Sequence, residues 1–143
     1  MRADALARAL VLAAALAAVA GCARTEAPPP PIVAGTPCAH CGMDAGNLRF
    51  ACEQRVAGQW RVYDSIECLA ADSSAGDRVA LADYDTRALH DADSLAIVHG
   101  AFSSPMGGGY AAFLDRAAAD SLASARQGRR VTVAEARVAE ARP

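Results

Sequence analysis

The order of expected elements occurs twice along the chain, and this constrains the fold most. Apolar and polar residues mix or alternate in a way that predicts two strands, then a helix, then a third strand; these lie at 48–55, 60–63, 66–73 and 78–82. The same order follows in the second half, at 95–102, 110–114, 116–126 and 129–133. Asp64-Ser65 and Asp115 stand where residues that cap helices are expected.

This order predicts an α+β fold made of two ββαβ units, over residues 37–85 and 86–134. Tyr63-Asp64-Ser65 aligns with Phe113-Leu114-Asp115, which brings both helices and both following strands into register. Because units of this size bury little core alone, we expect the halves to pack together. Residues 135–143 are expected to form a flexible tail.

The N-terminus predicts export. Residues 1–21 combine a basic start, at Arg2 and Arg8, with an apolar run over 9–20 that is too short to span a bilayer. The run ends in Val19-Ala20-Gly21-Cys22, which resembles a bacterial lipobox and makes Cys22 the expected lipidation site. Lipidation would tether a periplasm-facing domain to a membrane without a transmembrane helix. Ala23, where an Asp would favour inner-membrane retention, favours the outer membrane.

Residues 22–36 are expected to be a spacer, because they carry four consecutive prolines at 28–31. The formal net charge of −2 and the absence of lysine give no electrostatic support for nucleic-acid binding. No carboxylate pair, nucleophile–base pair or phosphate loop indicates an enzyme.

The chemistry of the chain is concentrated in Cys38-Ala39-His40-Cys41-Gly42-Met43. The Cys-x-x-Cys spacing suits two sulfurs on one metal or one disulfide. An even number of cysteines beyond Cys22 in an exported domain also fits a disulfide-stapled lipoprotein that acts as an assembly or binding module. Structural zinc, completed by His40, Cys52 or Cys68, is a third alternative. A thiol-disulfide oxidoreductase is a fourth, although its motif would be expected between a strand and a helix.

Two methionines shift the balance towards a soft metal. Met43 follows the cysteine pair, and Met106 lies in Ser104-Pro105-Met106-Gly107-Gly108-Gly109. Thioethers on glycine-flanked loops are unusual core residues, and sulfur donors favour Cu(I) over Mg, Ca or Mn. We therefore expect Cu(I) to be bound by the cysteine motif and a loop of the second half.

These motifs, in this order, resemble the nitrous-oxide-reductase accessory lipoproteins (NosL). The resemblance rests on the lipobox, Cys-x-x-Cys-Gly-Met, Asp-Ser-Ile-Glu-Cys-Leu and Ser-Pro-Met-Gly-Gly-Gly, and it covers residues 37–133. It implies a lipid-anchored periplasmic copper chaperone with a pair of ββαβ units. The implied partners are nitrous oxide reductase or its periplasmic maturation protein associated with an ABC transporter.

The resemblance also implies roles for individual residues. Cys38, Cys41 and Met43 match candidate Cu(I) ligands, and Met106 matches a ligand or transfer residue. Cys68 matches a further ligand or a core residue. His40 is expected to be an exposed polar residue, and Cys52 a buried core thiol, because neither has a role that the resemblance supplies.

Overall fold

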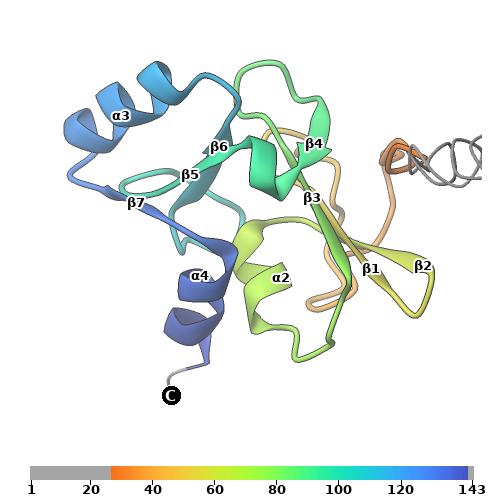
Figure 1. Cartoon of the computed structure of the whole chain (residues 1–143). Coiled ribbons are helices and arrows are strands. Elements are labelled where there is room, and N and C mark those ends of the chain that lie inside the picture. The colour runs from red at the N-terminus through yellow and green to blue at the C-terminus, as the bar shows by residue number, and fades with distance from the viewer. Residues whose placement is uncertain (1–26, 142–143) are drawn as a thin grey trace, which may run out of the picture.

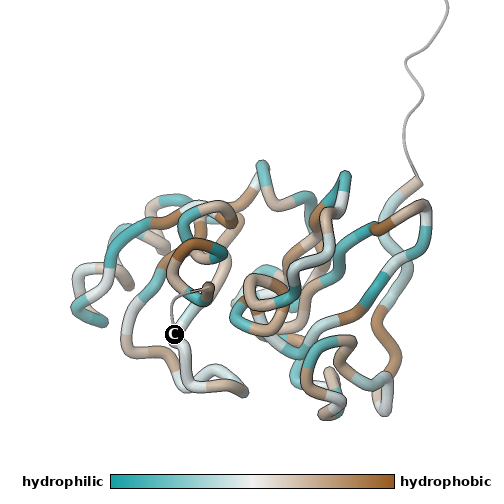
Figure 2. The backbone as a smooth tube through the Cα atoms, turned by 90° about the horizontal axis from the view of Figure 1, so that it is seen from below, coloured by the Kyte–Doolittle hydropathy of each residue, from teal (hydrophilic) through white to brown (hydrophobic). Residues whose placement is uncertain are grey.

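The computed structural model of the chain describes residues 27–141 (Figure 1). The expected signal peptide over 1–21, the lipidation site Cys22 and the first residues of the linker lie outside the described residues. Strongly hydrophobic residues occur in short segments separated by hydrophilic ones (Figure 2). Among the helices of residues 27–141, none has the length and hydropathy needed to cross a membrane.

The first half forms a four-stranded antiparallel sheet in the order β2-β1-β3-β4. Its elements are β1 (Cys52–Val56), β2 (Gln59–Tyr63), α2 (Ile66–Ala71), β3 (Arg78–Ala82) and β4 (Leu89–Asp91). The hairpin of β1 and β2 projects from the body of the molecule, as Figure 1 shows.

The second half forms a three-stranded antiparallel sheet in the order β6-β5-β7. Its elements are the 3-10 helix η1 (Ala92–Ser94), β5 (Ala96–His99), β6 (Tyr110–Phe113), α3 (Arg116–Ala125), β7 (Arg129–Val131) and α4 (Val133–Glu140). The carboxylate of Asp115 caps α3 by accepting hydrogen bonds from the backbone N–H groups of Ala117 and Ala118.

The predicted α+β class is confirmed, and β–β–α–β runs occur in both halves. In each sheet the first strand of the run lies between the other two. That the halves are copies of one unit stays a prediction. The first strand starts at Cys52 rather than at residue 48, because the amide of Phe50 bonds to the carbonyl of Asn47 in a turn.

One hydrophobic core joins the two halves, as expected. Its buried members come from both, including Tyr63, Cys68 and Leu69 from the first and Ile97 and Tyr110 from the second. A parallel bridge between residues 83 and 112 also connects them, and the amide of residue 84 donates to the carbonyl of residue 112 at 2.7 Å. The packing of β3 towards β6 therefore holds the sheets together.

The structure differs from the expected flexible tail in its described part, residues 135–141, because α4 is a capped helix that packs beside α2 (Figure 1). Thr132 and Glu135 form a reciprocal capping box at its start. Ala136 is buried in the core, and Arg137 donates hydrogen bonds to the carbonyl of Asp72, at 3.0 Å, and to Oε1 of Gln54.

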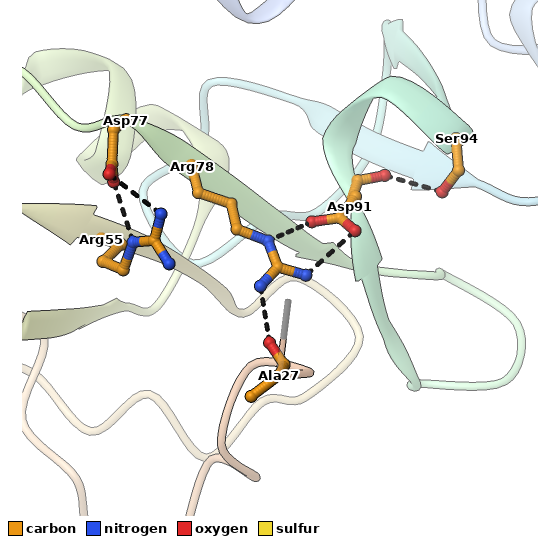
Figure 3. A network of polar contacts seen from close by, with 6 residues as sticks. All are labelled: Ala27, Arg55, Asp77, Arg78, Asp91 and Ser94. Carbon is orange, nitrogen blue, oxygen red and sulfur yellow. Dashed lines mark hydrogen bonds and ion pairs between the residues drawn. The ribbon is translucent and has the colours of Figure 1, made fainter. Parts of the chain in front are cut away.

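The expected spacer also differs from the structure in its described part. Arg78 donates through Nη1 to the carbonyl of Ala27 at 2.6 Å while its other nitrogens bind both carboxylate oxygens of Asp91 (Figure 3). A pocket of 320 Å³ is lined by Pro29, Pro31 and Ile32 together with Leu48, residues of β3 and β4, and the loop between these strands. These linker residues therefore lie along the domain and do not extend away from it.

Candidate metal centre

The cysteine motif forms a tight loop beside the edge strand β2. An isolated antiparallel bridge between Pro37 and Asp44 closes the loop. Inside it, the amide of Cys38 donates to the carbonyl of Met43 at 2.7 Å, and the amide of Gly42 donates to the carbonyl of Cys38 at 2.9 Å. Gly42 has a φ of +77°, in the left-handed region that favours glycine. The loop therefore turns back on itself between its two thiols.

The second part of the site comes from the junction of β2 and α2. Ser65 caps α2, and its hydroxyl accepts a hydrogen bond from the amide of Cys68 at 3.3 Å. The motif loop is attached to the same strand, because the amide of Ala39 donates to the carbonyl of Val62 at 2.8 Å. These two attachments bring the first turn of α2 against the cysteine loop.

Four side chains converge at this point: Cys38, Cys41, Asp64 and Cys68. Their three sulfurs and one carboxylate oxygen all lie within 4.8 Å of one another. The thiol of Cys41 lies 3.6 Å from Oδ2 of Asp64. Cys38, Asp64 and Cys68 are at most 3% exposed, whereas Cys41 is half-buried. This cluster could hold a metal ion, and Cys41 is its most accessible sulfur.

The surroundings hold protons on two of these thiols in the metal-free protein. Burial raises the pKa of Cys41, and burial with the adjacent Asp64 carboxylate raises the pKa of Cys68 well above its usual range. Thiolate is the form that binds metal, so a metal ion entering this site would displace protons.

The structure brings together three of the five sulfurs named from the sequence, namely Cys38, Cys41 and Cys68. Met43 lies in the motif loop with its side chain 46% exposed. Met106 is 47% exposed and lines a pocket of 190 Å³ next to the cluster, together with Cys68. Both thioethers are therefore accessible from outside, and Met106 shares a pocket with a cluster thiol.

Asp64 is the cluster residue that sequence reasoning missed. We interpreted it only as part of the helix cap, but the hydroxyl of Ser65 makes the capping bond. The useful signal was the position of Asp64. It lies four residues before Cys68 and directly after β2, the second strand of the hairpin.

Cys52 is buried and His40 is exposed, as expected. Cys52 is fully buried, and its thiol lies 3.2 Å from the carbonyl of Ser65. His40 is exposed, although it contributes to the wall of the same pocket as Cys68 and Met106. The four cysteines of residues 27–141 are all free thiols.

No protein-family model and no curated protein matches this chain. The function of the chain is therefore inferred from the site itself.

Proposed function

We propose that this chain is a lipid-anchored, periplasm-facing chaperone that binds Cu(I) and delivers it for the maturation of nitrous oxide reductase. The convergence of Cys38, Cys41 and Cys68 within 4.8 Å carries the proposal. Three thiolates form a soft donor set, and soft donors select Cu(I).

The exposure of the donors supports transfer rather than permanent storage. The sulfurs of Cys38 and Cys68 are buried, but Cys41 is half-buried and two exposed thioethers, Met43 and Met106, belong to nearby loops. An acceptor protein could reach the metal through Cys41 and replace the chaperone's ligands one at a time.

The client and the compartment follow from the lipobox at Cys22 and the order of motifs. A host strain that lacks this chain should accumulate nitrous oxide reductase with less copper per enzyme. Normal copper content in that enzyme would point to another client.

The test of copper binding is a competition titration of the reduced full-length protein, in detergent, against a chromogenic Cu(I) chelator. We expect affinity tighter than about micromolar. Changing Cys38, Cys41 or Cys68 to Ser should weaken binding by at least about tenfold, since even changes to residues that only orient a metal ligand typically do so. Cys52→Ser is the matched control, because Cys52 is a buried thiol outside the cluster.

Two results would contradict the proposal. One is binding weaker than micromolar. The other is an equal loss of affinity in Cys52→Ser, which would mean that the cluster is not the site.

Structural zinc is a second candidate, and Asp64 is the observation that favours it. Three cysteines and a carboxylate supply the four donors of a tetrahedral zinc site. Asp64→Asn separates the two functions, because a neutral amide is a poor zinc ligand and Cu(I) needs no carboxylate. Unchanged zinc affinity in Asp64→Asn would remove the observation that favours zinc, whereas loss of zinc affinity with unchanged Cu(I) affinity would show that only zinc uses this carboxylate.

A further inference from the structure

Glu67 connects the helix of the metal cluster to the loop that carries Met106. It precedes Cys68 in α2 and is 3% exposed. Its Oε1 accepts a hydrogen bond from the amide of Gly109 at 3.1 Å and another from the hydroxyl of Ser104. One carboxylate oxygen therefore binds both ends of the loop over 104–109.

The loop is also shaped around this side chain. A Cβ atom on Gly108 would lie 2.2 Å from Cγ of Glu67, so the glycine backbone packs directly on the stem of the glutamate. The amide of Gly107 donates to the carbonyl of Ser104 at 3.0 Å and closes the turn. Met106 stands at the outer part of this turn, where its side chain is 47% exposed.

The pocket next to the cluster relates this loop to the metal ligands. The same pocket of 190 Å³ is lined by Glu67, Cys68, Met106 and Gly108. If the loop moved away from Glu67, the pocket would therefore open and Cys68, which lines it, would become more accessible.

We infer that Glu67 is a positioning residue that holds the Met106 loop against the pocket of Cys68 and so controls how fast the bound metal is exchanged. The role in exchange rests on the proposed function. The clamp itself is a property of the metal-free protein and can be measured without copper.

Glu53 provides a matched comparison. It is also a buried glutamate, 1% exposed, but it lies in β1 opposite Val62 and Ala80. Within the described residues, Oε2 has no hydrogen-bond partner in either glutamate. A change to Gln therefore keeps the accepting Oε1 of Glu67, and a change to Ala removes the side chain in either glutamate.

The experiment measures hydrogen–deuterium exchange of the 104–109 amides in the metal-free full-length protein, and then the rate at which a chelator removes Cu(I) from it. Glu67→Ala should raise exchange at Gly109 and accelerate Cu(I) removal, each by roughly tenfold or more, because it removes the buried carboxyl oxygen that accepts from both ends of the loop. Glu67→Gln should restore both to within about threefold of the parent, since its amide oxygen still accepts. Glu53→Ala should leave both unchanged even if it lowers stability.

Two outcomes overturn the inference. If loop exchange rises equally in Glu67→Ala and Glu53→Ala, the effect is general destabilisation. If the loop opens in Glu67→Ala while Cu(I) removal keeps its parental rate, Glu67 does not control exchange.

Two further outcomes remain decisive. If Glu67→Ala does not fold, Ser104→Ala removes the hydroxyl that donates to Glu67 and also accepts from the amide of Gly109 at 2.9 Å. The readout is then the amide of Gly107, which bonds to the backbone carbonyl of Ser104 and not to its hydroxyl; unchanged exchange at Gly107 overturns the clamp. If the chain does not bind Cu(I), the proposed function and the role in exchange both fail, and amide exchange alone decides whether Glu67 positions the loop.

Discussion

Gly42 is the single residue on which the geometry of the motif loop depends most directly. Its φ of +77° would cost a residue with a Cβ roughly 1 kcal/mol, although nothing lies within 4 Å of where that Cβ would be. Gly42→Ala should therefore lower stability by about this amount and also weaken metal binding, since the turn places Cys38 and Cys41 together. Urea unfolding and Cu(I) competition measure the two effects.

Gly58 supplies the control for that prediction. It has a φ of +78° with nothing within 4 Å, but it lies in the turn between β1 and β2. Gly58→Ala should cause a similar loss of stability and leave metal affinity unchanged. Equal metal affinity in the two variants would contradict the role assigned to Gly42.

Glu53 makes the stability of the fold depend on pH. Burial raises its pKa from 4.5 to about 7. The folded protein therefore holds this proton more tightly than the unfolded chain does, and the corresponding stability is full below about pH 4.5 and is lost as pH rises to about 7. The loss is at most about 3 kcal/mol.

Glu53→Gln removes this dependence, so the variant should gain stability relative to the parent between pH 5 and pH 8. Urea unfolding at the two pH values measures the gain. Asp85→Asn, which changes an exposed carboxylate, should show no comparable gain. The prediction fails if the free energy of unfolding of Glu53→Gln differs from that of the parent by the same amount at both pH values.

Several elements were predictable because their signals are local. Alternation identified the β1–β2 hairpin, and polar residues at Ser65 and Asp115 identified the starts of α2 and α3. The three-residue strand β4 was not predictable, since its pairing with β3 depends on tertiary contact. Helix α4 did have a signal, Thr132 followed by Glu135 in capping-box spacing, which the expectation of a flexible tail overlooked.

Helix α4 should contribute to stability through Arg137. This residue donates to the carbonyl of Asp72 at the end of α2 and to Gln54 in β1. Arg137→Ala removes a charged donor from two acceptors and should lower the free energy of unfolding by about 1–3 kcal/mol. Urea unfolding measures this change.

Arg130→Ala is the control for Arg137→Ala. Arg130 pairs with Asp120 at 3.2 Å, but both side chains are more than a third exposed. Such a pair contributes about 1 kcal/mol or less. If the two variants lose the same stability, α4 is not held by Arg137.

At the scale of the molecule, the site was only partly predictable. The spacing of Cys38 and Cys41 is local, and it placed two sulfurs together correctly. Before the resemblance, Cys68 was only one of three residues that could complete a zinc site, and Asp64 was missed, because both reach the cluster through the attachment of the motif loop to β2. The spacing of residues along the sequence gives no information about that attachment, because it joins distant segments of the chain.

The described part of the linker packs against the domain, so it belongs to the folded part of the molecule. Pro29, Pro31 and Ile32 line a pocket with the domain, and the carbonyl of Ala27 accepts a hydrogen bond from Arg78 (Figure 3). The described linker residues therefore lie on the surface of the domain and do not form an extended spacer.

The central claim is that the fold assembles a sulfur site for Cu(I), and X-ray absorption at the copper K-edge tests it most directly. We predict a nearest shell of sulfur only in the Cu(I)-loaded full-length protein. That shell should be lost when Cys38, Cys41 and Cys68 are changed together to Ser, and kept in Cys52→Ser. A shell of nitrogen or oxygen, or a sulfur shell that survives the triple change, would contradict the account.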